Sequence, residues 1–261
     1  MQHTINPYAT KLIFEYELRA IFRDRGNLLR IICIEPLAYL FLLVGGLKGL
    51  SGNHMVWGGE HFDYITFVYP GVLALQFLRT FTHSVYRFTI DRRWGLQALK
   101  IASGIDSLSY IIGMVATPTA LFVIQTVITL PFALLLGVQM SFVGIFILLF
   151  QGMLAVFCWT LMAAAITAFF KNYTQRDLFL SFILLPLTFT APVFYSMDKA
   201  AFYLQIISKL NPFSYQVIAM RQAFLFESFS FSFFTMLVCA VLLLCSTLYS
   251  LGKGDLINSE V

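Results

Sequence analysis

Residues 107–170, SLSYIIGMVATPTALFVIQTVITLPFALLLGVQMSFVGIFILLFQGMLAVFCWTLMAAAITAFF, decide the fold because this run contains no charged side chain. At about 1.5 Å of rise per helical residue, it would extend roughly three times the ~30 Å thickness of a bilayer's hydrocarbon core. We therefore expect it to cross a membrane more than once, with a turn over residues 137–141. Helices satisfy their own backbone hydrogen bonds in lipid, whereas the run is too long and too continuously apolar for barrel strands. The sequence predicts an all-α integral membrane protein.

The rest of the chain supports this prediction. Of its 261 residues, 59% are hydrophobic and 11% are charged, whereas soluble domains contain roughly 25% charged residues. Hydropathy predicts six transmembrane helices, at residues 31–47, 62–88, 108–136, 141–170, 178–197 and 229–251. The four cysteines all fall in apolar runs and are interpreted as small hydrophobic residues. No repeat or separable soluble part is evident, so we expect one domain over residues 1–261.

Lysines and arginines predict the orientation. With the N-terminus in the cytoplasm, 12 of them fall on cytoplasmic segments and four on outer segments, so the positive-inside rule places both termini in the cytoplasm. Residues 1–30 show no cleavable signal peptide, and apolar residues recur at Leu12, Ile13, Tyr16 and Ala20. We interpret them as an amphipathic interface helix, the alternative being a helix in water. Residues 89–106 become a cytoplasmic loop. Residues 198–228 become an extracytoplasmic segment of short helices, either re-entrant or flat on the membrane.

Two charges are expected inside the spans. Glu35 lies near the cytoplasmic start of the first span, and Arg79 lies in the inner half of the second. Because the two spans run in opposite directions, both charges are expected at a similar depth. An unpaired charge in lipid is costly, so we predict a Glu35–Arg79 contact or a shared polar cavity. The alternative is that Arg79 extends to the inner headgroups while Glu35 stays near the interface.

Motifs for chemistry are weak. A phosphate-binding loop ends in Gly-Lys-Ser/Thr, and the nearest sequence, Gly252-Lys253-Gly254, lacks the loop and the hydroxyl. The chain is thus expected to bind no ATP or other cofactor. His54 and His61 flank a turn-rich outer loop over residues 51–60 that we expect to be solvated rather than metal-binding. No nucleophile or metalloprotease signature predicts a catalytic residue, which argues against an enzyme acting on lipid-linked substrates. A stand-alone channel or secondary transporter would need more ionisable groups near the bilayer midplane.

Three stretches carry a resemblance to a known family. Residues 64–75, YITFVYPGVLAL, open the second span; residues 91–99, DRRWGLQAL, lie in the cytoplasmic loop; and residues 191–199, APVFYSMDK, precede LNPFSY at 210–215 and Arg221. In this order, the chain resembles the permease subunit of ABC-2 type exporters, the class that includes nodulation-factor, daunorubicin-type drug and polysaccharide export permeases. The similarity to the first two is greater. It extends over nearly the whole chain.

The resemblance implies a half-transporter in the bacterial inner membrane. Two copies of the chain would form the pathway for an amphiphilic substrate, and two copies of a separate ATP-binding cassette subunit would bind ATP and Mg²⁺ and dock beneath it. Its coupling segment would comprise Asp91, Arg92, Arg93, Trp94, Gly95 and Leu96, with Trp94 and Leu96 as apolar anchors and the arginines as electrostatic contacts. The alternative is that these arginines contact lipid headgroups.

The resemblance also implies an outer gate. In the family, the connection between the fifth and sixth spans folds as short helices that dip into the outer leaflet. Asn211 and Pro212 would form the turn that splits them, because proline favours the first position of a helix. The gate residues would be Asn211, Pro212, Tyr215 and Arg221, with Arg221 near headgroups or an exit path.

Overall fold

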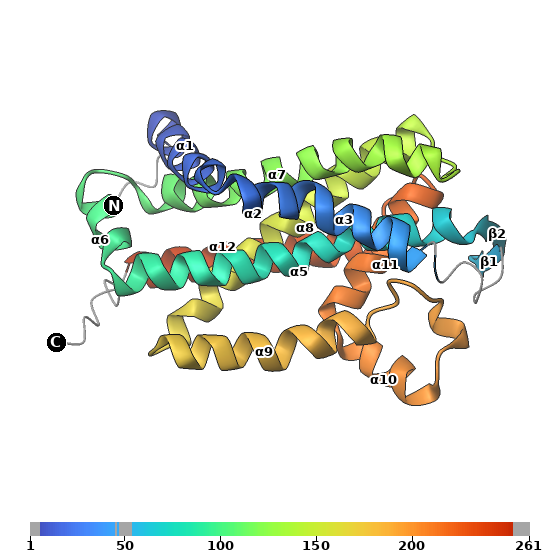
Figure 1. Ribbon diagram of the computed structural model, residues 1–261. Coiled ribbons are helices and arrows are strands. Elements are labelled where there is room, and N and C mark those ends of the chain that lie inside the picture. Colours follow the sequence, from blue (N-terminus) through green and yellow to red (C-terminus); the bar gives the residue numbers. More distant parts are fainter. Residues whose placement is uncertain (1–5, 45, 47–53, 253–261) are drawn as a thin grey trace.

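The computed structural model describes residues 6–44, 46 and 54–252, most of them in helices (Figure 1). Residues 1–5 of the predicted interface helix and the end of the predicted first span lie outside this description. The elements, in chain order, are α1 (Pro7–Arg23), α2 (Arg25–Leu29), η1 (Arg30–Ile34), α3 (Glu35–Ala38), η2 (Tyr39–Val44), β1 (His54–Trp57), β2 (Glu60–Asp63), α5 (Tyr64–Arg93), α6 (Leu96–Ala102), α7 (Ser107–Leu135), α8 (Phe142–Ile166), η3 (Thr167–Phe169), α9 (Tyr173–Thr190), η4 (Met197–Lys199), α10 (Phe202–Leu210), α11 (Pro212–Leu225) and α12 (Phe231–Gly252).

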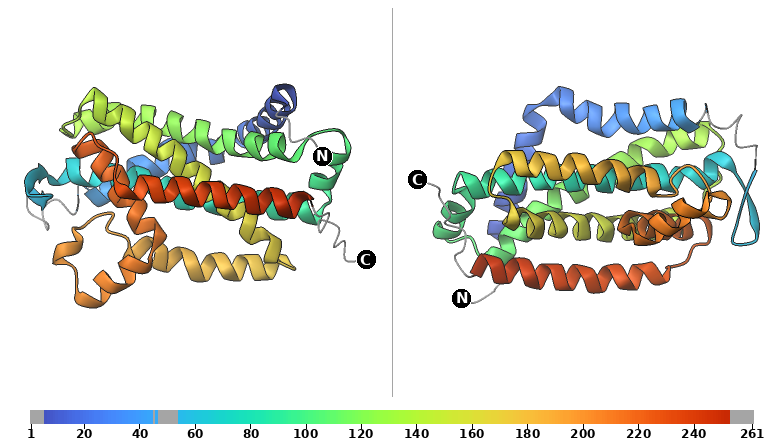
Figure 2. Two further views of the ribbon diagram at one scale, coloured as in Figure 1. Left: turned by 180° about the vertical axis from the view of Figure 1, so that it is seen from behind. Right: turned by 90° about the horizontal axis from the view of Figure 1, so that it is seen from below.

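The long helices run roughly side by side, and the two ends of the bundle differ (Figures 1 and 2). The α6 end carries α1, the short helix α6 and the end of α12. The hairpin end carries β1, β2 and α10. Because α1 and the end of α12 lie at the same end of the bundle, the chain runs along it an even number of times, as the sequence predicts. Two stretches, Ser107–Leu135 and Phe142–Phe169, are long and apolar enough by themselves to cross a membrane. The total of six spans stays a prediction.

The N-terminal helix α1 packs across α7. Asn6 caps it by accepting hydrogen bonds from the backbone N–H groups of Tyr8 and Ala9. Ala9, Ile13 and Glu17, spaced four residues apart, form its buried face. Gly113 of α7 allows the close approach, since a Cβ there would lie 2.6 Å from the Cβ of Ile13. The buried face thus differs from the apolar face expected from the sequence, of which only Ile13 is buried.

The core of the bundle is formed by α5, α7 and α8. Phe122 of α7 packs on Gly152 of α8, where a Cβ would lie 2.2 Å from the ring. The same ring contacts Phe77 of α5, with the ring centroids 5.6 Å apart. The α7–α8 turn lies where the sequence predicts it, and Gly137 adopts φ +85°, a left-handed conformation that favours glycine. These three helices form the base on which the candidate sites are built.

Two boundaries differ from the sequence prediction. The sequence predicts a solvated loop over residues 51–60 and a span from residue 62, whereas residues 54–57 and 60–63 form an antiparallel hairpin in which Met55 pairs with Phe62 and Trp57 with Glu60. The predicted fifth span, residues 178–197, is wrong at both ends, since α9 covers Tyr173–Thr190. Asn172 starts the helix early by accepting a hydrogen bond from the N–H of Gln175. Pro192 ends it early, because the residue before a proline avoids the helical conformation.

Candidate functional site

The coupling segment, residues 91–96, forms the connection between α5 and α6. Arg93 is the last residue of α5 and Leu96 the first of α6. Gly95 makes the sharp turn at φ +66°, a conformation that side chains disfavour. Trp94 is 72% exposed. The segment therefore presents an apolar side chain at the α6 end, the end that the charge distribution assigns to the cytoplasm.

Behind this turn lies a buried group of charges, the ionic cluster of Glu17, Arg87, Asp91, Lys100 and Tyr110. Asp91 is fully buried, and its Oδ2 accepts hydrogen bonds from Lys100 Nζ at 2.6 Å and from Tyr110 Oη at 2.8 Å. Arg87 donates two hydrogen bonds to the buried carboxylate of Glu17, at 2.9 and 2.5 Å, and lies 3.8 Å from Asp91. Asp91 is thus the one residue of the predicted coupling segment that is fully buried, behind the turn rather than on its surface.

The two arginines of the coupling segment also point inward. Arg92 Nη2 donates to the carbonyl of Ala164 at 3.2 Å, and Arg93 Nη1 donates to the carbonyl of Lys171 at 2.5 Å. Burial lowers the pKa of the Arg92 guanidinium below its ordinary value. Arg92 is half-buried, whereas the other side of Arg93 is open to solvent. Arg92 is therefore an internal tie, and Arg93 is the one arginine of the pair left to face a partner.

A third set of contacts, the Tyr173 clasp, joins the coupling segment to the start of α9. The guanidinium carbons of Arg93 and Arg176 lie 4.7 and 4.9 Å from the centre of the Tyr173 ring. Trp94 Nε1 donates a hydrogen bond to Tyr173 Oη at 3.0 Å. Arg176 also stacks on Tyr86 of α5 at 4.1 Å. Sequence reasoning missed Tyr173 and Arg176, although an aromatic residue three positions before an arginine is a helical-neighbour spacing.

The apolar side chains at this end differ in exposure. Leu96 is half-buried and lines a groove of about 400 Å³ between α1 and α6, beside Leu12 and Tyr16. Leu99, one turn further along α6, lines the same groove and is 67% exposed. Trp94 and Leu99 are the more exposed apolar side chains of this surface.

The predicted intramembrane charges lie together. The Arg79 guanidinium contacts the Glu35 carboxylate directly. Arg79 Nη1 also donates to the carbonyl of Ile31 at 3.2 Å and to Gln76 Oε1 at 3.0 Å. Arg30 lies 3.5 Å from the other side of Glu35. These contacts connect the chain near Glu35 to α5. The π-helical segments η1 and η2 flank Glu35 and Pro36, where the proline removes a backbone hydrogen bond of the helix.

The outer segment consists of two helices with different environments. Helix α10 exposes Phe202, Tyr203 and Leu210, whereas nine of the 14 residues of α11 are buried, against α5 and α8. Asn211 separates them and caps α11 by accepting from the N–H of Phe213 at 2.8 Å. Its Nδ2 donates to the carbonyl of Leu187 and to Thr190 Oγ1, at 2.9 and 2.8 Å. The turn at Asn211 and the helix start at Pro212 are as predicted, and Asn211 also binds the end of α9.

Two other gate residues were predicted to act at the outer surface. Tyr215 is partly exposed, and its hydroxyl donates to the carbonyl of Lys209 at 2.7 Å. Arg221 is 1% exposed and donates to the carbonyls of Phe67, Pro192 and Val193 at 2.8 to 3.1 Å. Its guanidinium also stacks on the Phe67 ring at 3.7 Å. Arg221 therefore does not reach the outer surface as predicted, because the carbonyls of Phe67 in α5 and of Pro192 and Val193 after α9 bind it inside the protein.

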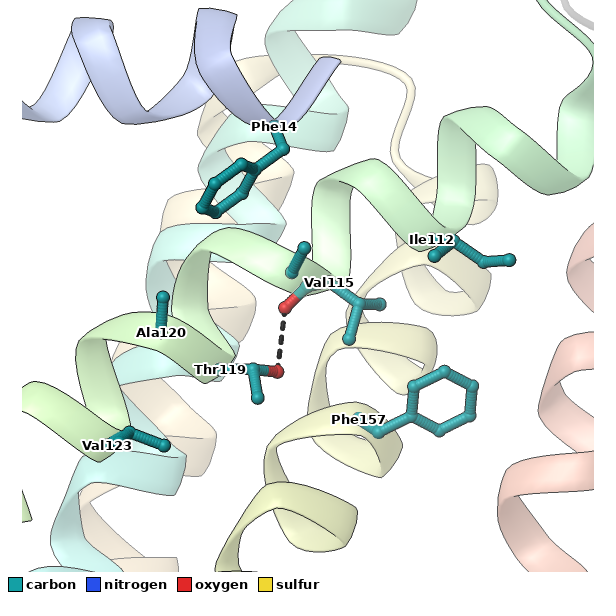
Figure 3. A pocket seen from close by; sticks show the side chains of 8 residues that line it. Phe14, Ile112, Val115, Thr119, Ala120, Val123 and Phe157 are labelled. Atoms are coloured by element: carbon teal, nitrogen blue, oxygen red, sulfur yellow. Dashed lines mark hydrogen bonds between the residues drawn. The ribbon is translucent and has the colours of Figure 1, made fainter. Parts of the chain in front are cut away.

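An apolar groove of about 400 Å³ lies beside α7, below Phe14 of α1 and facing Phe157 of α8 (Figure 3). The hydroxyl of Thr119 donates its hydrogen bond to the carbonyl of Val115 at 2.8 Å. Across residues 6–44, 46 and 54–252, no cluster of three histidine, cysteine or acidic side chains is arranged to hold a metal.

Comparison with known proteins decides the family. The family model for the ABC-2 type transporter matches residues 8–225, most of the chain. The chain belongs to the ABC-2 type transporter family. It is therefore a permease component, a transport subunit rather than an enzyme.

Named relatives are distant. The chain is 24% identical over 224 residues to the inner membrane transport permease YadH of Escherichia coli K12, covering 82% of this chain and 84% of YadH. It is 25% identical over 175 residues to ycf38 of Cyanophora paradoxa, named as a transport permease, covering 65% of this chain. That match spans 59% of the length of ycf38, less than two thirds.

Proposed function

We propose that this chain is the membrane-spanning half of an ATP-driven exporter in the bacterial inner membrane. Two copies would form the pathway, and two copies of a separate ATP-binding cassette subunit would bind ATP and Mg²⁺ and dock at the α6 end. The substrate class that suits an apolar bundle is an amphiphile such as a drug, a lipid or a lipo-oligosaccharide. YadH, the relative that covers most of the chain, is named an inner membrane transport permease, which supports the location.

The coupling segment carries this proposal. Trp94 and Leu99 are exposed apolar side chains at the tip of α5 and on α6. Exposed tryptophan and leucine on a fixed backbone suit the centre of a protein interface, where a few apolar anchors supply most of the binding energy. The turn is held from behind by Asp91 and Arg92, so it is able to transmit force rather than deform. A docking surface on a rigid support is what a permease without its own nucleotide site requires.

The outer segment supports export through the same assembly. Helix α11 enters the bundle, while α10 displays aromatic and aliphatic side chains outward. Backbone at membrane depth is tolerated where it is packed against protein, and α11 meets that condition. We place the outer gate at the α10–α11 connection, with Asn211 and Tyr215 at its turn.

Co-purification tests the docking surface. The chain and an ATP-binding cassette subunit from the same genome would be co-expressed, and the recovery of the ATPase with Leu99→Asp compared with that of wild type. A charge at a central apolar anchor is expected to reduce the recovered ATPase by at least about tenfold. Phe202→Ala is the matched control, since Phe202 is 77% exposed at the opposite end and should leave recovery unchanged. Equal ATPase recovery with Leu99→Asp and with wild type would remove α6 from the interface.

A further inference from the structure

Helix α9 is attached to the rest of the protein in an unusual way. Of its 18 residues, Arg176 and Leu180 alone are buried. Phe182, Leu185 and Phe189 are 64 to 75% exposed along its length. In Figure 1 the helix runs along one edge of the bundle, with its two ends leading to η3 and to the outer segment. One face of α9, with Phe179, Leu184 and Leu187, packs against the core, while the opposite face is exposed in this protomer.

Its ends, by contrast, carry specific polar contacts. At the α6 end, Tyr173 accepts a hydrogen bond from Trp94 and stacks against the guanidinium of Arg93. At the hairpin end, Asn211 donates to Leu187 and Thr190 in the last turn of the helix. A helix of 18 residues is about 27 Å long, which is most of the hydrocarbon thickness. The two sets of contacts therefore connect the coupling segment to the outer segment through one helix.

We propose that Tyr173 is a positioning residue that fastens the coupling segment to α9, so that α9 carries movement of the coupling segment to Asn211 at the outer turn. The inference rests on the proposed function, because it assumes that a partner moves the coupling segment. A helix keeps its length when pushed at one end, so contacts at its two ends make α9 a continuous link between them. Coupling between distant sites needs an element that both sites act upon, and α9 is that element here.

The ring and the hydroxyl of Tyr173 contribute separately, which provides graded variants. Tyr173→Phe keeps the surface for Arg93 and Arg176 but removes the acceptor for the Trp94 indole. Tyr173→Leu removes the aromatic ring as well, so both cation–π contacts are lost. Tyr8→Leu is the matched control, since Tyr8 is 76% exposed at the same end of the bundle.

The experiment measures movement at the outer turn in the complex with the ATPase. In a background without the native cysteines, Leu210→Cys places a thiol beside Asn211, at a position 81% exposed. Its reaction rate with a maleimide would be measured in nanodiscs with and without ATP and vanadate. Wild type and Tyr8→Leu should show an ATP-dependent change in rate. Tyr173→Leu should reduce that change by at least about fivefold, and Tyr173→Phe by less, while ATPase binding and hydrolysis persist.

A double-variant comparison sharpens the test. Asn211→Ser keeps a side-chain acceptor for capping α11 but lacks the amide that reaches α9. If one helix carries the signal, Asn211→Ser and Tyr173→Leu should each reduce the ATP-dependent change by at least about fivefold, and the two together should reduce it no further. Additive losses would overturn the proposal, as would an unchanged response in Tyr173→Leu or no response in wild type. Loss of ATPase binding in Tyr173→Leu would also overturn it. Because Leu99→Asp tests docking without touching the clasp, failure of the proposed function is distinguishable.

Discussion

Helices α1 and α9 both flank the bundle, but the protein holds them by different means. Along its length, α1 is fixed by Ile13 packed onto Gly113 and by the buried Glu17–Arg87 pair. Helix α9 has little buried along its body and is held at its ends, by Tyr173 at one and Asn211 at the other. The same fold therefore contains one flanking helix fixed along its buried face and another whose polar contacts lie at its two ends.

The largest effect is expected from Arg87→Ala. This change leaves the carboxylates of Glu17 and Asp91 buried without their guanidinium partner, and breaking a buried ion pair in this way costs about 3–5 kcal/mol. We expect a large drop in the free energy of unfolding, measured by denaturant titration in detergent. Arg19→Ala is the control, because Arg19 pairs with Glu15 on the exposed side of the same helix and should change nothing measurable.

A rescue variant separates charge from packing at this site. Glu17→Gln combined with Arg87→Gln removes both charges while keeping similar volumes, and should recover part of the loss. If Arg87→Ala were as stable as wild type, the ionic cluster would not be what fixes α1, and the comparison between α1 and α9 would fail.

Arg221→Ala should have the next largest effect. The guanidinium donates hydrogen bonds to the carbonyls of Phe67, Pro192 and Val193. A buried carbonyl left without a donor lowers the free energy of unfolding by about 1–3 kcal/mol. We expect a loss of about 3 kcal/mol, read from the same titration. Arg221→Lys should recover little, since one ammonium does not reproduce the planar set of donors. A full recovery with lysine would show that a single contact suffices to fix the chain after α9.

Gly113→Leu tests the contact of α1 directly. A Cβ at this position would approach within 2.6 Å of Ile13 and 3.1 Å of the carbonyl of Thr10, so α1 must move outward. Overpacking of this kind costs about 1–3 kcal/mol. We expect faster proteolysis of the N-terminal helix together with the stability loss. Val127→Leu is the control, because Val127 is 55% exposed on α7 and lies 14 residues from Gly113, and it should leave proteolysis unchanged.

The sequence predicted which regions matter better than how they are held. Absence of charge over residues 107–170 indicated α7 and α8, and equal depth in opposite spans suggested the Glu35–Arg79 contact that the structure contains. The location of the coupling segment followed from its motif. The sequence did not predict the contacts that hold this segment from inside. Asp91 binds Lys100 and Tyr110, 9 and 19 positions away, and Arg87 connects it to Glu17 of α1. No periodicity shows which of several nearby charges will pair.

Arg221 illustrates a second limit. A single arginine in a semi-apolar segment is normally expected at a polar boundary. The sequence contains Pro192, which stops α9 and leaves backbone carbonyls without helical partners, but it does not show that these carbonyls face a helix 29 residues later. The predicted span over residues 178–197 missed the end of α9, because it continued the helix through Pro192. Reading the end of α9 correctly would have supplied both the boundary and a partner for Arg221.

The smallest effect is expected from Asp177→Asn near the start of α9. The hydrogen bond from Arg176 lowers the pKa of the Asp177 carboxyl below its ordinary value. The pair therefore contributes stability above the ordinary carboxyl pKa, and that contribution is lost as pH falls through the lowered value. Because Asp177 is half-exposed, the change in melting temperature at neutral pH should be less than about 1 °C. Thermal unfolding of wild type and variant at pH 7 and below pH 4 would measure it. A large destabilisation at pH 7 would mean that this end of α9 is held by charge, as α1 is, and the contrast between the two helices would disappear.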